Sequence, residues 1–318
     1  MEQKSITVLS FGGGQDSTTI LYKLIYDQAF RSKYLKGELI VLMSDTGNEH
    51  PHTYTHIEFI KQFCFIHKIE FYLIDHTMGY HPKNWPTLQD QFLKYSTIMS
   101  VAFPKSCTDN LKIRPLYNFL DHYIATRYYG YSDQIPPKGK KYIKQFSRQY
   151  GKFNVLLGIA LGEESRIKPS KKLKDRKVQL ELFEELPHSY STWMESSIYK
   201  IYPLITERLD RKACQQYILS IGLPLPFPSN CMFCPYASKI EILWLFRTYP
   251  KVFMDWVNFE KKKLHKFSTV SIKNNLGVKG KQTLQQFLDD AITEFGHLTM
   301  EQLSEYKMSH GHCVMSSY

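Results

Sequence analysis

The sequence of 318 residues lacks the features that mark a membrane-spanning or disulfide-stabilised protein. No run approaches the ~20 consecutive apolar residues that are needed to span a bilayer, and the opening Met-Glu-Gln-Lys is not a signal peptide. Six cysteines are too few for a disulfide scaffold in a chain of this length, so we expect them to bind metal, react or pack in a reducing compartment. These absences predict a cytoplasmic protein with no membrane segment.

Acidic residues are also scarce. The chain has 30 Asp and Glu against 41 Lys and Arg, which gives a formal charge of +11. This surplus favours polyanionic partners, and the basic stretches at residues 136–141 and 168–177 would suit a nucleic-acid backbone. A basic protein with solvated lysines would have the same charge. The hydrophobic share of 43% is ample for a core.

A glycine-rich stretch lies between a predicted strand and a predicted helix near the start of the chain. The apolar run 6–9 precedes it, and residues 18–25 fit the first turns of a helix. Glycines let the backbone approach an anion, and the first N–H groups of a helix are unpaired at the positive end of its dipole. The residues that we expect to bind a phosphate group here are Ser10, Phe11, Gly12, Gly13, Gly14, Gln15, Asp16 and Ser17.

The spacing in this stretch excludes two common phosphate loops. A Walker A loop needs a lysine where Asp16 stands, and a Rossmann loop needs a glycine where Ser17 stands. The stretch instead resembles the Ser-Gly-Gly-x-Asp-Ser loop of the PP-loop ATP pyrophosphatases, in the form found in the phosphoadenosine-phosphosulfate-reductase-like branch. Gly12 replaces the family's usual serine, and Ser10 is another source of a hydroxyl. A glycine turn without a ligand is the alternative.

A second match follows the next apolar run, residues 38–43. Asp45 and Thr46 come directly after it, and ligands of open parallel sheets bind at the carboxyl ends of strands. The family has a similar Asp-Thr-Gly followed by Pro-x-Thr-Tyr, which is matched at 51–54. We therefore expect Asp45 and Thr46 to reach the nucleotide, although a simple turn is the alternative.

Two cationic side chains, Lys112 and Arg114, alternate with Leu111 and Ile113. This alternation predicts a strand with both charges on one side. The segment from Cys107 to Pro115 resembles the family's Cys-Thr to Lys-x-x-Pro segment. The resemblance implies that both cations act in catalysis with Asp16 and Ser17, by stabilising charge on the polyphosphate. Surface charge on a strand is the alternative.

The apolar run 154–159 predicts a fourth strand, and the residues after it resemble the family's Gly-x-Arg-x-x-Glu-Ser. The resemblance implies that Gly158 and Glu164 bind the nucleotide. The match is imperfect, because Ala160 replaces the arginine and the Glu-Ser pair comes one residue late. A solvated helix start is the alternative for Glu164.

Cys231 and Cys234 are separated by two residues, a spacing that lets two thiolates bind one metal or cluster. A pair cannot complete a tetrahedral site, and the candidates for the other ligands are Cys107 together with Cys313 or a histidine. The family's sulfonucleotide reductases and DNA phosphorothioation proteins have a similar Cys-x-x-Cys. The resemblance implies a [4Fe-4S] cluster, with Zn²⁺ as the alternative metal; a redox-active or packing cysteine pair is also open.

The run of apolar strands and helical stretches predicts an α/β fold with a parallel, doubly wound sheet and a mostly helical C-terminal region. The resemblance, over residues 1–75, 107–115, 153–166 and 201–236, specifies the adenine nucleotide alpha-hydrolase-like form. We expect a nucleotide-binding domain over 1–230, with insertions at about 76–106 and 130–152, and a cysteine-containing helical region over 231–318. Residues 132–152 are polar and basic and are predicted to form a loop or hairpin.

The resemblance also implies a reaction. ATP would bind in the loop with Mg²⁺, an oxygen of the substrate would attack the α-phosphate, and pyrophosphate would leave. With the basic stretches, this predicts an ATP pyrophosphatase that adenylates DNA or tRNA for sulfur incorporation, with a sulfur donor such as a cysteine desulfurase as a partner. The alternatives are a sulfonucleotide (PAPS or APS) reductase and a nucleotide-binding module of a larger complex without catalysis.

Overall fold

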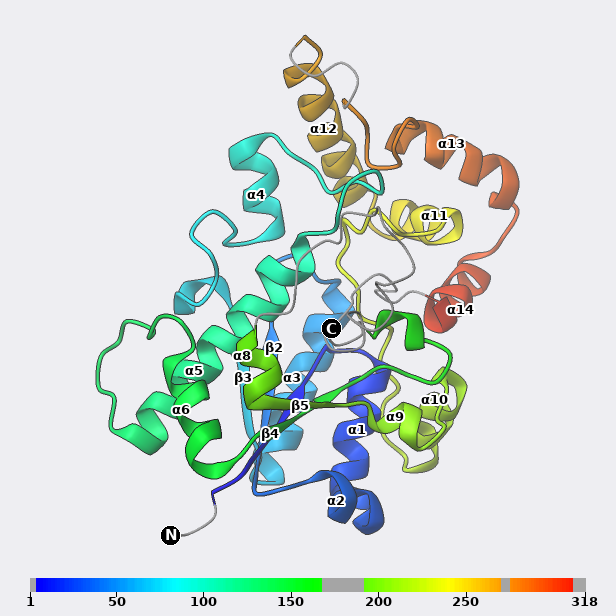
Figure 1. Cartoon of the computed structure of the whole chain (residues 1–318). Helices are drawn as coiled ribbons and strands as arrows, with labels where there is room; N and C mark the ends of the chain where they lie inside the picture. Colours follow the sequence, from blue (N-terminus) through cyan, green and yellow to red (C-terminus); the bar gives the residue numbers. More distant parts are fainter. Residues whose placement is uncertain (1–3, 168–191, 270–274, 311–318) are drawn as a thin grey trace, which may run out of the picture.

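The computed structural model describes residues 4–167, 192–269 and 275–310. A parallel sheet of five strands in the order β3-β2-β1-β4-β5 lies at its centre (Figure 1). This is the doubly wound α/β class that the sequence predicts. The strands are β1 (Ile6–Ser10), β2 (Glu38–Ser44), β3 (Glu70–Ile74), β4 (Phe153–Leu157) and β5 (Ile198–Ile201).

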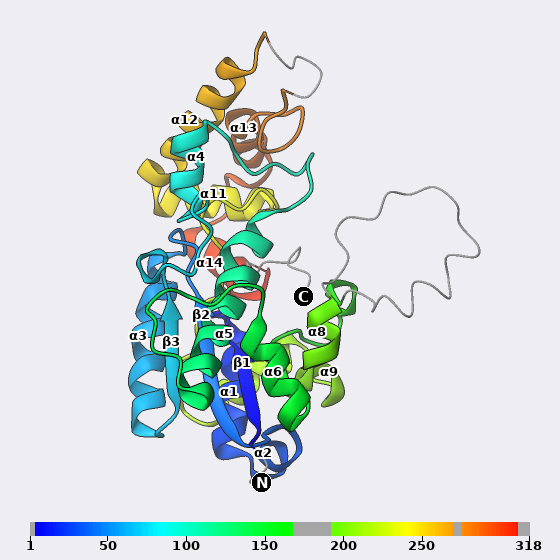
Figure 2. The ribbon, with the colours of Figure 1, turned by 60° about the vertical axis from the view of Figure 1, so that its left-hand side comes forward.

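Helices cover both faces of the sheet (Figure 2). Because both faces are covered, the central strands β1 and β4 are buried on both sides instead of alternating between buried and exposed residues. One face packs against α1 (Gln15–Tyr26), α2 (Gln28–Tyr34), α3 (Pro51–Ile66), α9 (Pro203–Thr206) and α10 (Arg211–Ser220). The other packs against α5 (Arg114–Tyr129), α6 (Lys141–Tyr150) and α8 (Thr192–Ser197).

A second group of helices lies beyond one end of the sheet, and most of them are in the upper part of Figures 1 and 2. Its apolar core joins residues 85–111 to residues 233–303, so part of the predicted 76–106 insertion packs with the C-terminal region. The stacked rings of Phe92 and Phe233, 6.1 Å apart between centroids, are one such contact. The helices of this group are α4 (Leu88–Tyr95), α11 (Lys239–Thr248), α12 (Pro250–Lys266), α13 (Leu284–Phe295) and α14 (Met300–His310).

The helix boundaries follow local chemistry. Ser238 and Thr283 each form a capping box with the residue three positions on, at the starts of α11 and α13.

Among the described residues, no helix is both long and apolar enough to cross a membrane.

Two predicted elements are wrong. Residues 111–114 are not a strand, because Asp109–Ile113 form a π-helical turn that continues into α5. The predicted loop over 132–152 contains α6, whose buried Ile143 and Phe146 pack against α5 and the sheet. In each case the residues form helical structure, because a short sequence pattern does not distinguish a helix from a strand or a loop.

The strand order sets the position of the site. The chain winds from β1 through β2 to β3, and β4 then returns to the other side of β1. The crevice at the carboxyl ends of strands beside such a reversal is where doubly wound folds bind ligands. The glycine-rich loop follows β1 directly, so the loop lies at this crevice.

Candidate nucleotide-binding site

The glycine-rich loop joins β1 to the start of α1 at this crevice. Gly14 is the N-cap of α1 and no side chain caps it. Ser17 closes the loop, because its Oγ accepts a hydrogen bond from Gly12 N at 3.1 Å and donates one to Gly14 O at 3.2 Å. The open N-terminus of a helix is a preformed site for an anion.

Three glycines of the site are constrained: Gly13 by its backbone conformation, and Gly14 and Gly158 by close packing, since a Cβ on Gly14 would lie 3.0 Å from Ser229 N. Gly13 has φ of +73°, and a Cβ there would lie 3.1 Å from Thr53 Cγ2. A Cβ on Gly158 would lie 2.9 Å from Ser17 N, so the backbone after β4 touches the loop. Gly12 differs, since a Cβ there would meet only Ser17 Oγ, at 3.9 Å. This position therefore has room for a Cβ.

Two adjoining pockets open at the loop. They share Ser10, Gly12, Lys112 and Leu157 as a common wall. The first has an apolar lining; its further residues are Phe11, Met43, Ser44, Ile113, Leu116 and Tyr117. The second, which we call the polar pocket, is lined by charged and polar side chains together with apolar surface and spans about 560 Å³, including space open to solvent; its further residues are Gly14, Gln15, Asp16, Ser17, Gly158, Arg166, Arg211, Pro228 and Ser229. An apolar compartment beside a polar one suits a ligand with a base and a phosphate chain.

Charged side chains in the polar pocket form a connected network. One nitrogen of Arg211, Nη2, lies 3.1 Å from Asp16 Oδ2 and 2.8 Å from Glu163 Oε1. The other carboxylate oxygen of Glu163 lies 2.6 Å from Arg166 Nη1. These four side chains are between 11% and 14% exposed, so the pairs are only weakly screened by water. The sequence pattern does not single out Arg211 as a site residue.

Lys112 is the cation at the common wall of the two pockets. Its Nζ lies 3.6 Å from Oε1 of Glu49, a carboxylate with no exposed side-chain surface. The hydroxyl of Thr46 donates to the same oxygen at 3.0 Å. Thr46 thus acts on the pocket through Glu49 and Lys112 and is not itself a lining residue.

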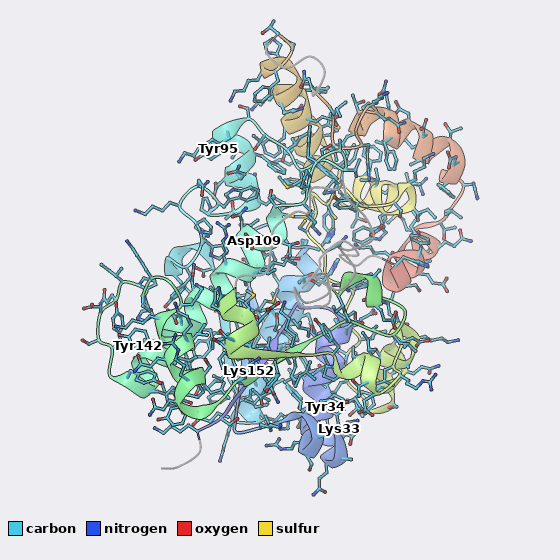
Figure 3. The ribbon with its side chains drawn as sticks, viewed as in Figure 1. Lys33, Tyr34, Tyr95, Asp109, Tyr142 and Lys152 are labelled. Carbon is cyan, nitrogen blue, oxygen red and sulfur yellow. The ribbon has the colours of Figure 1, made fainter. Side chains whose placement is uncertain are left out.

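The expectation that Lys112 and Arg114 face one side is wrong. The π-helical turn directs Lys112 to the pockets, whereas Arg114 starts α5 with a side chain that is 58% exposed. Its Nε pairs with Asp109 at 2.7 Å, and Arg114 lines neither pocket. Figure 3 labels Asp109 on the turn above α5.

Asp45 and Glu164 also lie outside the two pockets. Asp45 Oδ1 accepts hydrogen bonds from Gly47 N and from Tyr54 Oη, each at 2.9 Å, and burial raises the pKa of Asp45. Glu164 is exposed and accepts from Gly162 N at 3.0 Å. The neighbouring Glu163, not Glu164, reaches the pocket charges.

Gln15 lines the polar pocket but its side chain is bound elsewhere. Its Nε2 donates to Pro226 O at 2.9 Å and to Met308 O at 3.3 Å, and its Oε1 accepts from Gln215 at 3.0 Å. Gln15 therefore joins the start of α1 to α10 and α14.

The Cys-x-x-Cys turn lies beside the same region. Cys231 forms a β-bridge with Glu49, and Met232 N donates to Asn48 O at 2.9 Å. Cys107 and Cys231 both pack against the apolar core of the second group of helices. Within residues 4–167, 192–269 and 275–310, however, no three His, Cys, Asp or Glu side chains are placed to hold a metal ion. Cys313 lies outside the described residues, so the four-cysteine ligand set stays a prediction.

The basic stretch at 168–177 also lies outside the described residues. Glu207 does not line either pocket: its Oε1 accepts from Tyr34 Oη at 2.6 Å and from Lys33 at 2.8 Å. Figure 3 shows Lys33 and Tyr34 together at the end of the molecule where α2 lies. Glu207 thus anchors α2.

Comparisons with known proteins do not show which family this chain belongs to. No family model matches the chain, and no curated protein matches it. A solved structure that it resembles is the U34-tRNA thiolase NcsA from Methanococcus maripaludis with its [4Fe-4S] cluster. The match covers 95% of this chain and 75% of that chain, with 15% identity and a TM-score of 0.38. A likeness this distant carries no argument about substrate or cofactor.

Proposed function

We propose that this chain is an ATP pyrophosphatase that binds ATP at the loop over residues 10–17 and adenylates a substrate. The observation that carries the proposal is the pair of adjoining pockets at that loop. The apolar pocket, with Phe11 and Tyr117, suits the adenosine. The polar pocket, with the start of α1, suits the phosphate chain.

The position of Lys112 suggests how the reaction would be assisted. In this arrangement the α-phosphate lies where the two pockets join, and Lys112 is on their common wall. A fixed cation there would stabilise the negative charge that develops as an oxygen attacks the α-phosphate. Glu49 holds Lys112 in that position. Lys112 is thus the proposed catalytic cation, and Ser17 with the loop amides would bind the departing pyrophosphate.

Asp16 is the pocket-lining carboxylate among the described residues and is the candidate ligand for Mg²⁺. When bound, Mg²⁺ would screen the charge of the pyrophosphate. Asp16 is paired with Arg211, and a phosphate group can also bind Arg211. Asp16 could therefore exchange Arg211 for Mg²⁺ when the nucleotide binds.

A nucleic acid is the proposed acceptor, and sulfur incorporation the proposed outcome. The net charge of +11 supports a polyanionic partner. The nearness of the Cys231 turn to Glu49 supports a link between sulfur chemistry and the pocket. We derive no step through a metal cluster, because the described cysteines do not complete a ligand set.

The test is pyrophosphate release from ATP by anaerobically purified protein, with and without DNA or tRNA. We expect release that rises with one nucleic acid and is lost in Asp16→Ala and Ser17→Ala, while both variants keep the circular dichroism spectrum of the wild type. Normal turnover in both variants would refute the site assignment. ATP binding without turnover under all conditions would favour a nucleotide-binding module, and reduction of PAPS or APS a sulfonucleotide reductase.

A further inference from the structure

The three cations that line the pockets are already paired with carboxylates. Lys112 lies 3.6 Å from Glu49, and Arg166 lies 2.6 Å from Glu163. Arg211 is shared by two carboxylates, Asp16 at 3.1 Å and Glu163 at 2.8 Å. A pocket that receives a polyphosphate would be expected to present cations whose charge is uncompensated. Here the protein's own carboxylates compensate the cations in place.

Backbone contacts fix Arg211 at this point. Asp210 caps α10, accepting from Ala213 N at 2.8 Å, and Arg211 is the first residue of that helix. Leu161 N donates to Leu209 O at 2.9 Å, which ties the segment carrying Glu163 to the start of α10. Arg211 and Glu163 are therefore held together by the fold and do not meet by chance on a flexible surface.

We propose that Arg211 is a phosphate-binding residue that Asp16 and Glu163 hold in position, and that Glu163 sets the preference of the pocket for metal-complexed over metal-free polyphosphate. This inference rests on the proposed ATP site and names how that site selects its ligand. Glu163 acts through Arg211 and Arg166 and is a positioning residue.

The physical argument is one of competing charges. A metal-free polyphosphate that enters the pocket must take Arg211 from two carboxylates and lie near both of them in a partly buried site. A bound divalent cation cancels part of the ligand's charge and gives Asp16 a new partner, so Arg211 is released to the phosphate oxygens at lower cost. The carboxylates thus disfavour the metal-free ligand more than the metal complex.

The experiment is titration calorimetry with ATP and with inorganic pyrophosphate, each in Mg²⁺ and in EDTA, at one ionic strength. Glu163→Gln removes the charge that holds Arg211 and Arg166. We expect this variant to bind both ligands about tenfold more tightly in EDTA and to change little in Mg²⁺, so that the Mg²⁺ preference falls. Arg211→Gln should lower the affinity for pyrophosphate about tenfold in Mg²⁺.

Glu164→Gln is the matched control. It makes the same change of charge one residue away, on an exposed side chain outside the pockets, and should keep the wild-type Mg²⁺ preference. The inference is overturned if Glu163→Gln and Glu164→Gln have the same preference. It is also overturned if Arg211→Gln lowers the melting temperature but leaves pyrophosphate affinity unchanged, since Arg211 would then have only a structural role.

The proposed function fails in a different way. If the folded wild type binds neither ATP nor pyrophosphate in Mg²⁺ or in EDTA, the site itself is refuted. If it binds both ligands equally well with and without Mg²⁺, the ATP site stands and the role of Glu163 is refuted.

Discussion

Single residues of the loop are constrained by contacts that a sequence motif does not reveal. Gly13 is required by its backbone conformation, while Gly158 is required by its close approach to Ser17, where an added Cβ would lie 2.9 Å from the backbone nitrogen. Gly12 is required by neither, although it stands in the middle of the motif. A glycine that lies within the motif is thus not always one that the structure requires.

Gly158→Ala should therefore destabilise the protein, because the added methyl group pushes against the backbone of the loop and cannot be relieved by a side-chain movement. We expect the free energy of unfolding to fall by about 1–3 kcal/mol. Chemical denaturation measures it. Gly12→Ala, which adds the same group 3.9 Å from Ser17 Oγ, should change it by less than about 0.5 kcal/mol. Equal losses in the two variants would contradict this account of the loop.

Arg211 and Glu49 are the site residues that could not be predicted from the sequence. Asp16, Ser17 and Gly158 could be predicted, because each lies in a short sequence motif at the end of a predicted strand. Arg211 could not, since 195 residues separate it from Asp16 and its only local signal is the helix cap Asp210. Glu49 lies within the predicted 45–54 segment, yet nothing in that pattern indicates that its side chain meets Lys112.

At the scale of elements, the sheet could be predicted and the turn before α5 could not. Buried parallel strands are continuous apolar runs, which the sequence displays at 6–9, 38–43 and 154–159. The alternation of Lys112 and Arg114 with apolar residues fits a strand as well as it fits a helical turn. In a helical turn, however, residues two positions apart lie on nearly opposite sides of the axis, so one cation faces the pocket and the other faces solvent.

The packing of α1 against α3 depends on a neutral histidine. His56 of α3 lies 3.0 Å from Thr18 Oγ1 of α1, and burial lowers its pKa to about 4. An unfolded histidine titrates near 6.5, so between pH 6.5 and 4 the unfolded chain binds more protons than the folded one at this position. Stability must then fall as the pH falls through this window.

We expect His56 to contribute a loss of about 3 kcal/mol in the free energy of unfolding between pH 6.5 and pH 4. Urea denaturation at a series of pH values measures this loss. His56→Gln, which can still bond Thr18, should flatten that part of the profile. His297→Gln, on an exposed histidine, should leave it as in the wild type. Identical pH profiles for wild type and His56→Gln would rule out the buried neutral histidine.

At the scale of the whole molecule, the site is assembled from nearly the full length of the chain. The loop after β1, Lys112 before α5, Glu163 after β4 and Arg211 at the start of α10 meet at one crevice. The C-terminal helices also reach it, since Gln15 at the start of α1 is bonded to Met308 of α14. A change in the distant α14 can therefore reach the phosphate loop through a single side chain.

The measurement that tests the central claim most directly is the affinity for ATP of Lys112→Met and Arg114→Met beside the wild type. Both variants remove one cation within the same short segment, but only Lys112 lines the pockets. The account predicts that Lys112→Met binds Mg²⁺-ATP about tenfold more weakly and that Arg114→Met binds it as the wild type does. Wild-type affinity in Lys112→Met, or a greater loss in Arg114→Met, would contradict it.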